Sequence, residues 1–420
     1  MVITKKLKVR PPDLYMSNNR LEIVSETKPS GHQDRRQTDL QTTCCCAKVT
    51  WGLNTEIIRT IYFAVIEPIV LYASSAWYPA AELQMIKNLL DTIQRGYAQK
   101  ICKAYRTVSL TSALVLSGLL PLDIRVQEAA NLYLAKKNIT RDYLPPGRKL
   151  EQWLHYLERP HPSKLKPTEF ELLEKLDTET IDSRCITGPQ IFTDGSKIGG
   201  KVGAALSWWE NGKETANATF QLNPACTVFQ AELYALHRAA QQAHQSGHPV
   251  TNIMSDSKSS LELLENPKLT HPLVKAVREI VEDARMENKE IPLHWIRAHV
   301  GTPGNERADE LAKEAALKIG HCVHYDKIPL SHVKRKIREE SVKKWQARYS
   351  TSQTGRVTKM FFPEVGKAYS ILRKTKMTPV LCQAFTGHGG LAEYLYRFRL
   401  KDSPACECDE PARLPGKQKT

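Results

Sequence analysis

The chain has few cysteines for its length. It contains 10 cysteines among 420 residues, and three of them, Cys44, Cys45 and Cys46, are adjacent. Adjacent cysteines rarely pair, and this content is too sparse for a disulfide scaffold. It favours a reduced, intracellular protein and does not separate a nuclear from a cytoplasmic location.

The chain also lacks a long uninterrupted apolar run. Its start, MVITKKLKVRPPDLYMSNN, has no apolar core after the basic residues, so no secretory signal is expected there. The most hydrophobic window, 57–78, is interrupted by Arg59, Glu67 and Pro68, which leaves no clean stretch of about 18 apolar residues. We expect a buried helical hairpin in this window and no membrane partner.

Positive charge is in excess, with 60 Lys and Arg against 45 Asp and Glu. Residues 188–320 carry 14 basic and 16 acidic residues, residues 321–420 carry 20 and 9, and residues 1–187 carry 26 and 20. Nucleic acid is the partner that such a balance suggests. A mildly acidic segment between basic flanks fits a carboxylate centre with an anionic substrate, although ordinary solvated faces give the same distribution.

Composition and periodicity divide the chain into five regions. Residues 1–43 are polar and aperiodic, and we expect a disordered basic N-terminus. Residues 44–140 have a helical pattern, residues 141–187 form a proline-punctuated linker, and residues 321–420 are basic and helical. The helical pattern of the second region is clearest where apolar side chains recur at three and four: Ile86, Leu89, Leu90, Ile93, Tyr97 and Ile101.

Residues 188–320 alternate strand and helix patterns. Three strand patterns separated by Gly-rich turns precede a helix, a short strand, two helices, a strand and a last helix, which predicts one α/β domain. In order these segments are IFTDGS, VGAALSWWE, ETANATFQL, VFQAELYALHRAAQQAHQ, VTNIMSDS, SSLELLENP, PLVKAVREIVEDARMEN, IPLHWIRAH and NERADELAKEAALK. Asn305 is an N-cap candidate for the last helix.

Four acidic residues lie where core elements begin or end. Asp194 is expected to close the first strand, although Asp-Gly also marks turns. Glu232 lies early in its helix, Asp256 closes a strand, and Asp309 follows Asn305 by one turn. Converging carboxylates repel one another unless cations join them, and Mg²⁺ prefers such oxygens. Two such ions can activate water for phosphodiester hydrolysis. Any one of these acids alone is more simply structural.

Four motifs carry a resemblance to type 1 ribonuclease H. They are TDGS at 193–196, QAELYAL at 230–236, SDSKSSL at 255–261 and AHVGTPGNERADELAKEA at 298–315. The resemblance implies a ribonuclease H-like mixed five-stranded sheet flanked by helices, in an α/β domain with helical flanking regions. It also implies an endonuclease that cuts the RNA strand of an RNA/DNA hybrid with two Mg²⁺ ions, for which Mn²⁺ can substitute.

The resemblance also assigns roles residue by residue. His299 matches a mobile histidine that assists proton transfer or product release, and Asn305 fits both a cap and a site-organising role. His294, on the last strand, is expected to be packed or exposed instead. The metal ligands implied are Asp194, Glu232, Asp256 and Asp309, and the substrate-binding positions are Gly195, Ser196, Thr227, which lies at a DNA phosphate, and Asn305.

The sequence departs from the family pattern just before the glutamate. Many relatives carry amide side chains three and four residues ahead of it, and this chain has Val228 and Phe229 there. Contact with the hybrid must then rely more on backbone groups, phosphates and 2′-hydroxyls.

The flanking regions resemble other parts of retrotransposon polyproteins. Residues 51–80 and 94–124 are similar to the region after the palm in reverse transcriptases of non-LTR, arthropod R1-like elements, a thumb or connection remnant. Residues 386–408 resemble the start of a cysteine–histidine knuckle. The polymerase carboxylate box is absent, so a polymerase would be a partner in trans. Zinc is not expected, because Cys406 and Cys408 lack the following ligands and His388 has unfamiliar spacing.

Two other interpretations compete with the nuclease. A catalytically silent retrotransposon relic that only binds nucleic acid would usually have lost a metal ligand, and all four remain. An integrase of the same superfamily fold needs another order of acids and a terminal glutamate, and Asp309 on the last helix argues against it.

Overall fold

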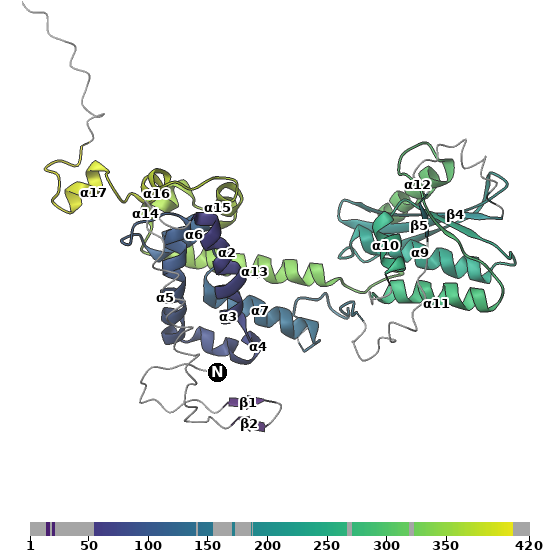
Figure 1. The fold of residues 1–420 in the computed structure, drawn as a ribbon, viewed down its shortest axis with the longest axis horizontal. Coiled ribbons are helices and arrows are strands. Elements are labelled where there is room, and N and C mark those ends of the chain that lie inside the picture. Colours follow the sequence, from purple (N-terminus) through teal and green to yellow (C-terminus); the bar gives the residue numbers. More distant parts are fainter. Residues whose placement is uncertain are drawn as a thin grey trace, which may run out of the picture. The chain divides into compact units, whose positions relative to one another are not determined.

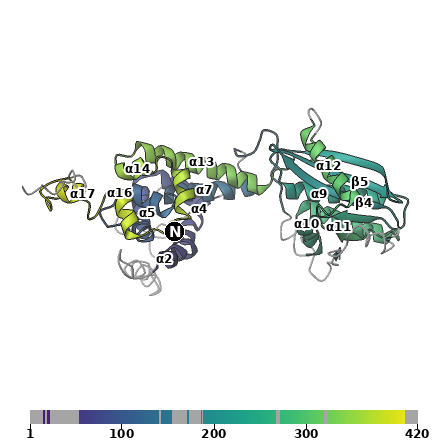
Figure 2. The ribbon, with the colours of Figure 1, turned by 90° about the horizontal axis from the view of Figure 1, so that it is seen from above.

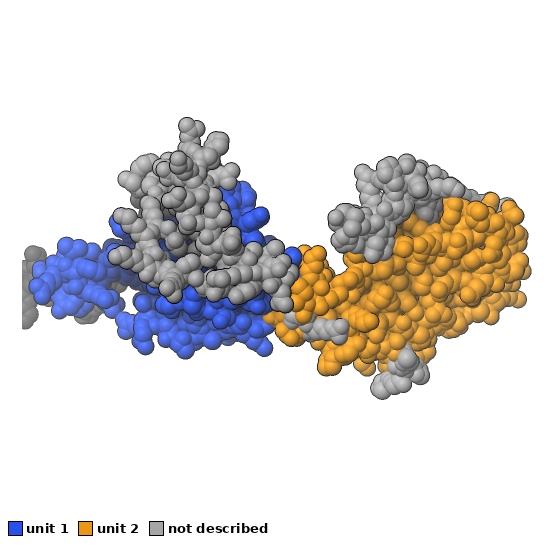
Figure 3. Space-filling view, turned by 90° about the horizontal axis from the view of Figure 1, so that it is seen from below, with its two compact units in different colours: residues 1–134, 337–420 blue, residues 135–336 orange. Residues whose placement is uncertain are grey.

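The computed structural model describes residues 14–16, 19–21, 54–139, 142–153, 170–172, 186, 188–266, 271–318 and 323–405. The chain divides into two compact units, which Figure 3 colours separately: unit 1 comprises 1–134 with 337–420, and unit 2 comprises 135–336. Within residues 1–43, strands β1 (Leu14–Met16) and β2 (Asn19–Leu21) pair antiparallel, which the polar composition did not predict. The predicted disorder otherwise lies outside the described residues.

Unit 2 contains a mixed sheet with the strand order β3-β8-β7-β4-β5-β6. The predicted mixed five-stranded sheet is confirmed: β4 (Gln190–Ile198), β5 (Lys201–Glu210) and β6 (Lys213–Leu222) are antiparallel, and β7 (Asn252–Ser255) and β8 (Leu293–Trp295) add in parallel. A sixth strand, β3 (Phe170–Leu172), extends the β8 edge in parallel from the stretch that the prolines marked as a linker.

Helices cover both faces of this sheet. Figure 1 shows α12 (Pro303–Leu317) on one side and α9 (Val228–Gln245) and α11 (Pro272–Met286) on the other. Neighbouring strand residues alternate between the faces, so Ile191 joins the core under α9 while Phe192 joins the core under α12. Seen from above in Figure 2, α12 runs over β4 and β5, on which it packs. Helix α10 (Lys258–Glu265) follows β7.

Asp194 does not close its strand. The sequence predicted that the strand ends at this residue, but β4 continues to Ile198, and Asp194 is opposite Ala205 in mid-strand. The turn comes later, at Gly199 (φ +56°) and Gly200 (φ +81°), where a left-handed backbone favours glycine. The Asp-Gly pair is therefore part of the sheet, which places the carboxylate over a packed surface.

Apart from the β1–β2 pair, the described part of unit 1 is helical. A hydrophobic core there includes Ile58, Tyr97 and Leu122 from its first part and Trp345 and Leu372 from its second part. Its elements are α2 (Thr55–Ile61), η1 (Tyr62–Ile66), α3 (Glu67–Leu71), α4 (Ser74–Trp77), η2 (Tyr78–Glu82), α5 (Gln84–Ile101), α6 (Leu110–Ser117), α7 (Leu122–Lys136), α13 (Leu330–Thr351), α14 (Arg356–Phe361), α15 (Val365–Leu372), α16 (Pro379–Thr386) and α17 (Ala392–Arg397), of which α7 and α13 extend into the numbering of unit 2.

Two helical expectations in unit 1 need correction. The window 57–78 does not fold back as a hairpin; the helices before and after residue 72 bend by 49°. Leu89 and Ile93 of α5 are exposed, although Leu90, Tyr97 and Ile101 of the same predicted stripe are buried. Among the described residues no single helix meets the length and hydropathy needed to cross a membrane, while two bent helix pairs, at 55–82 and 110–136, meet it by length and composition.

Candidate active site

Three of the predicted carboxylates meet on unit 2. One carboxylate oxygen each from Asp194, Glu232 and Asp256 lies within 4.8 Å of the other two. Asp194 comes from β4, Glu232 from the second turn of α9, and Asp256 from the residue after β7. Because β4 and β7 are parallel and Thr193 pairs with Ser255, the next residue of each chain segment, Asp194 or Asp256, comes to the same place on the sheet.

Gly195 allows the third carboxylate to approach. A Cβ atom at this position would lie 2.5 Å from the backbone nitrogen of Glu232 and 2.8 Å from the carbonyl carbon of Ala231. Only a residue without a side chain lets α9 pack this closely on β4. The Gly195 peptide group also hydrogen-bonds to Asp194 and Glu232, which favours their charged forms. Gly195 is thus required by packing, in addition to the substrate role that the resemblance implies.

Burial and mutual repulsion make these acids hard to ionise. Burial, together with the charges of Asp256 and Asp309, raises the pKa of Asp194 to about 7. Burial and the two neighbouring aspartates raise the pKa of Glu232 well above its usual range. Burial also raises the pKa of Asp256, against a hydrogen bond from Asn305 and the charge of His299. Three ionised carboxylates this close together repel one another, and a bound cation would stabilise their charged forms.

The polar atoms at this site fit a divalent metal ion. Glu232 Oε2 and Asn305 Oδ1 are buried, and neither has a hydrogen-bond partner among the described residues. A buried oxygen without a partner costs about 1–3 kcal/mol, so two such atoms in one site need an explanation. Carboxylate and amide oxygens are the ligands that hard cations prefer. Asp194, Glu232 and Asp256 can therefore hold a metal ion.

The fourth predicted ligand, Asp309, lies outside this group of three. It is on α12, close enough for its charge to raise the pKa values of Asp194 and Glu232. Its Oδ2 atom accepts a hydrogen bond of 2.6 Å from Lys313 Nζ, one helical turn further along. Lys313 was not predicted as a site residue, although the i, i+4 spacing of an acid and a base on one helix is the signal for such a pair.

His299 lies in an exposed turn between β8 and α12. Its backbone is left-handed, with φ of +54°, a conformation that a non-glycine residue adopts at some cost. Its charge lowers the pKa of Asp256, so the imidazole lies near the carboxylate cluster. An exposed imidazole beside the acids can exchange protons with both solvent and a bound substrate.

Asn305 is not the N-cap of α12. Thr302 occupies that position and Pro303 begins the helix, which makes Asn305 the third residue of α12, within its first turn. Its Nδ2 atom instead donates a hydrogen bond of 3.2 Å to Asp256 Oδ2. Of the two roles that the sequence left open, the cap is wrong, and the contact with Asp256 orients a site carboxylate.

The cap of α9 is Thr227, a predicted substrate residue. Its hydroxyl accepts from the backbone nitrogen of Gln230 at 3.2 Å, and Gln230 Oε1 accepts from the backbone nitrogen of Thr227 at 3.1 Å, a complete capping box. Ser196 is half-buried on β4, beyond Gly195. Val228 is exposed at the start of the helix, whereas Phe229 packs against the core.

His294 was expected to be either packed or exposed, and it is buried. Its Nε2 atom forms a hydrogen bond of 3.0 Å with Asn252 Oδ1. A second residue that the sequence did not reveal is Trp295, whose indole donates to the carbonyl of Asp256 at 3.0 Å. That bond fixes the backbone that carries the carboxylate. Strand periodicity does not predict this hydrogen bond, because the two residues are 39 positions apart in the sequence.

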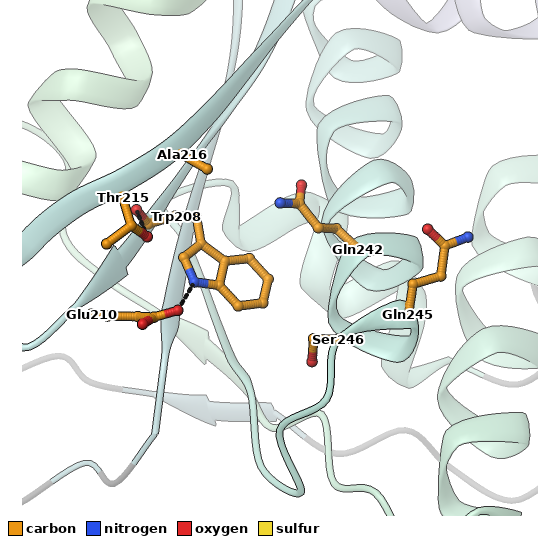
Figure 4. Close-up of a pocket in the computed structure, with 7 residues that line it drawn as sticks. All are labelled: Trp208, Glu210, Thr215, Ala216, Gln242, Gln245 and Ser246. Atoms are coloured by element: carbon orange, nitrogen blue, oxygen red, sulfur yellow. Dashed lines mark hydrogen bonds between the residues drawn. The ribbon is translucent and has the colours of Figure 1, made fainter.

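A separate hollow lies between the β5–β6 hairpin and the end of α9, with a volume of about 320 Å³. Figure 4 shows Trp208 in it, with its indole nitrogen bonded to Glu210 and Gln242 nearby. None of the predicted site residues lines this hollow.

Cys406 and Cys408 of the expected incomplete knuckle lie outside the described residues. His388, the third residue considered for that site, is in unit 1, where its Nδ1 atom forms a hydrogen bond of 2.9 Å with the carbonyl of Thr386.

Comparison with known proteins identifies part of unit 2. Residues 188–317 match the family model described as RNase H. This range contains all the acids discussed above and His299, and it forms an RNase H domain, the domain type of ribonuclease H enzymes.

Individual proteins match over limited parts of the chain. A Pol polyprotein from the type-1 retrotransposable element R1 4 of Nasonia vitripennis is 34% identical over 91 residues, which cover 22% of this chain and 23% of that protein. A ribonuclease H of Tropheryma whipplei is 28% identical over 142 residues, covering 30% and 81%. A solved LC11-RNase H1 in complex with an RNA/DNA hybrid is 22% identical, covers 31% and 96%, and has a TM-score of 0.26. The chain spans less than a quarter of the Nasonia polyprotein's length.

Proposed function

We propose that this chain is an endonuclease that hydrolyses the RNA strand of RNA/DNA hybrids with the help of two Mg²⁺ ions. One observation carries the proposal: three carboxylates from three separate elements lie within 4.8 Å, and one of their oxygens is buried without a partner among the described residues. A fold tolerates such a cost where the site serves chemistry. The RNase H match over the same residues supplies the reaction class.

The metal ligands in this proposal are Asp194, Glu232, Asp256 and Asp309. Bound divalent ions activate a water nucleophile and stabilise the leaving oxygen of an in-line phosphodiester displacement. The protein orients the ligands: the Asn305 amide holds one oxygen of Asp256, and the Gly195 peptide group bonds to Asp194 and Glu232. Mn²⁺ can substitute for Mg²⁺, because both prefer the same oxygen ligands.

His299 is proposed to move a proton at the leaving group or to assist product release. His299 lies in an exposed turn, so its ring has access to solvent, and its charge lowers the pKa of Asp256. A histidine is suited to this task because its pKa lies near neutral pH.

Substrate contact is proposed at Gly195 and Ser196 for the RNA backbone and at Thr227 for a DNA phosphate. The first two follow Asp194 on β4, and Thr227 begins α9, where backbone N–H groups favour an anion. Exposed Val228 adds no hydrogen-bonding group beside it. The contact therefore depends on phosphates and 2′-hydroxyls more than on base edges.

The rest of the chain is proposed to derive from an R1-like retrotransposon polyprotein. In this proposal, residues 44–140 descend from the reverse transcriptase thumb or connection, residues 188–320 are the nuclease domain, and residues 321–420 end in an incomplete knuckle. The likeness of the Nasonia polyprotein supports the origin, and the basic charge of residues 321–420 suits nucleic acid.

The test uses the full chain, an end-labelled RNA strand annealed to DNA, and Mg²⁺. Wild type should cut the hybrid and leave single-stranded RNA intact. Asp256→Asn should lose roughly 10³-fold in rate, because metal-ion catalysis supplies several kcal/mol. Asp283→Asn, which removes an exposed acid from α11, is the matched control and should retain activity. A folded protein that binds hybrid and leaves it uncut in both Mg²⁺ and Mn²⁺ would identify a nucleic-acid-binding relic.

A further inference from the structure

Two short segments outside the RNase H match pack onto the nuclease domain. The later one, residues 324–328, continues from the end of β6: His324 N donates to the carbonyl of Gln221 at 2.9 Å, and Asn223 N donates to the carbonyl of Tyr325 at 3.0 Å. Tyr325 also forms a parallel bridge with Leu222. The segment after α12 therefore returns to the loop that leads into α9.

The earlier segment, residues 148–151, pairs with the later one. Glu151 N donates to the carbonyl of Ile328 at 2.8 Å, and Ile328 N donates to the carbonyl of Lys149 at 2.9 Å. Arg148 adds an ion pair of 2.8 Å with Asp326. Residues 148–151 and 324–328 thus form one ladder, which we call the strap, although 170 and more residues separate its halves.

A buried polar cluster fastens the strap to the domain. Glu151, His271 and Tyr325 are 6%, 2% and 8% exposed. His271 Nε2 lies 3.1 Å from Glu151 Oε2, and the Tyr325 hydroxyl donates to Glu151 Oε1. His271 Nδ1 accepts from Leu273 N at 3.2 Å at the start of α11, so Nε2 carries the ring proton and donates to the carboxylate.

The charge of Glu151 depends on these donors. Burial opposes its ionisation, but the hydrogen bonds from His271 and Tyr325 outweigh burial, and the pKa of Glu151 is lowered. A buried carboxylate is stable only while its partners remain in place. The three side chains therefore hold the strap in one position as a unit.

The strap borders the loop 223–227, which enters α9. Cys226 Sγ lies 3.6 Å from the carbonyl of Lys327, and Lys197 Nζ donates to the carbonyls of Pro224 and Cys226 at 3.1 and 2.7 Å. The loop ends at Thr227, the cap of α9. It is thus fixed by the strap on one side and by β4, through Lys197, on the other.

We propose that the strap is a working part of the nuclease: Glu151, His271 and Tyr325 are positioning residues that hold loop 223–227, and with it Thr227, for the DNA strand of the hybrid. This inference rests on the proposed function. The carboxylate cluster is held separately by Gly195 and Asn305. Loosening the strap should therefore weaken substrate binding and leave the chemical step intact.

The test compares Glu151→Gln and Tyr325→Phe in the full chain. Glu151→Gln should raise the KM for hybrid roughly tenfold, the effect of a lost hydrogen bond to a charged group, with kcat changed by less than about twofold. Tyr349→Phe is the matched control, because its buried hydroxyl bonds to the carbonyl of Phe362 at 2.9 Å in unit 1. Hydrogen exchange at amides 223–231 should speed up in the two strap variants only.

A drop in kcat with unchanged KM, or unaltered exchange at 223–231 in both strap variants, would overturn the inference. If Glu151→Gln does not fold, Tyr325→Phe carries the test, since it removes one hydroxyl from the cluster. Hybrid affinity, measured in the Asp256→Asn background, and hydrogen exchange need no cleavage. They therefore separate a failure of this inference from a failure of the proposed nuclease activity.

Discussion

Unit 1 and the carboxylate cluster of unit 2 bury acidic residues in opposite ways. In unit 1, buried Asp123 accepts two hydrogen bonds from Arg348, at 2.8 and 2.5 Å, and buried Glu67 lies 2.8 Å from Arg125. In unit 2, the described residues place no arginine or lysine in an ion pair with Asp194 or Glu232, and burial raises the pKa of both. The arginine pairs stabilise a helical core, whereas Asp194 and Glu232 repel each other, which raises the pKa of Glu232 further.

The largest difference between the two kinds of buried acid is expected when Glu232 is substituted. Glu232→Gln should reduce hybrid cleavage by roughly 10³-fold, because a metal ligand is lost. The same change should raise the melting temperature of the metal-free protein, since one of three repelling carboxylates is gone. Cleavage rates and thermal unfolding in EDTA check both effects. Lost activity together with lost stability would contradict the proposed role of repulsion.

Replacing a buried acid by its amide in unit 1 should lower the stability of the protein and leave its activity unchanged, the reverse of the effect at Glu232. Asp123→Asn removes the partner of Arg348 and should cost about 2 kcal/mol of unfolding free energy, because the arginine loses its charge-assisted hydrogen bonds. Hybrid cleavage should be unchanged at temperatures where the variant is folded. Denaturant unfolding and the cleavage assay test this; a variant as stable as wild type would refute the structural role of the pair.

The two units should also differ in their response to pH. The folded-state pKa of Asp194 is raised to about 7 from an ordinary value of 3.8. Its contribution to stability is therefore complete below about pH 4 and is lost as the pH rises through 7. Metal-free unit 2 should lose stability over this range, and Asp194→Asn should lessen the loss. Thermal unfolding from pH 4 to 8 with EDTA measures it, and Mg²⁺ should remove the decline.

The smallest effect is expected at Lys313. Its 2.6 Å bond to Asp309 competes with a metal ion for that carboxylate. The pair is partly exposed, so Lys313→Met should tighten metal binding only about two- to threefold, as expected for a surface ion pair. Calorimetric Mn²⁺ titration, with Lys318→Met as the control, measures the change. Weaker binding in Lys313→Met would show that the lysine supports the site.

The order of elements in the RNase H domain could be predicted from the sequence, because strand and helix patterns are local. The approach of Asp256 to Asp194 follows from strands that add in parallel. The continuation of β4 beyond Asp194 could not be predicted, since Asp-Gly marks both turns and strands. Helix α12 begins at Pro303, with Thr302 as its N-cap, and not after Asn305, because proline suits the first helical position.

Contacts between residues far apart in the sequence could not be predicted from local patterns. Nothing near Asp123 in the sequence points to Arg348, which lies 225 residues later, and periodicity does not reveal that residues 58–124 and 345–382 share a core. The same limit hid the strap, whose three buried side chains come from three distant segments. Periodicity also counted Leu89 and Ile93 into a buried stripe, because it does not show which neighbour covers each helix face.

The most direct test of the central claim is a titration of the metal-free full chain with Mn²⁺, followed by electron paramagnetic resonance. Wild type and Asp283→Asn should bind the ion, Glu232→Gln should bind it at least roughly tenfold more weakly, and binding should strengthen as the pH rises through 7, because ligands must lose their protons. Equal binding by wild type and Glu232→Gln would contradict the claim that the unpaired carboxylates of unit 2 form a metal site.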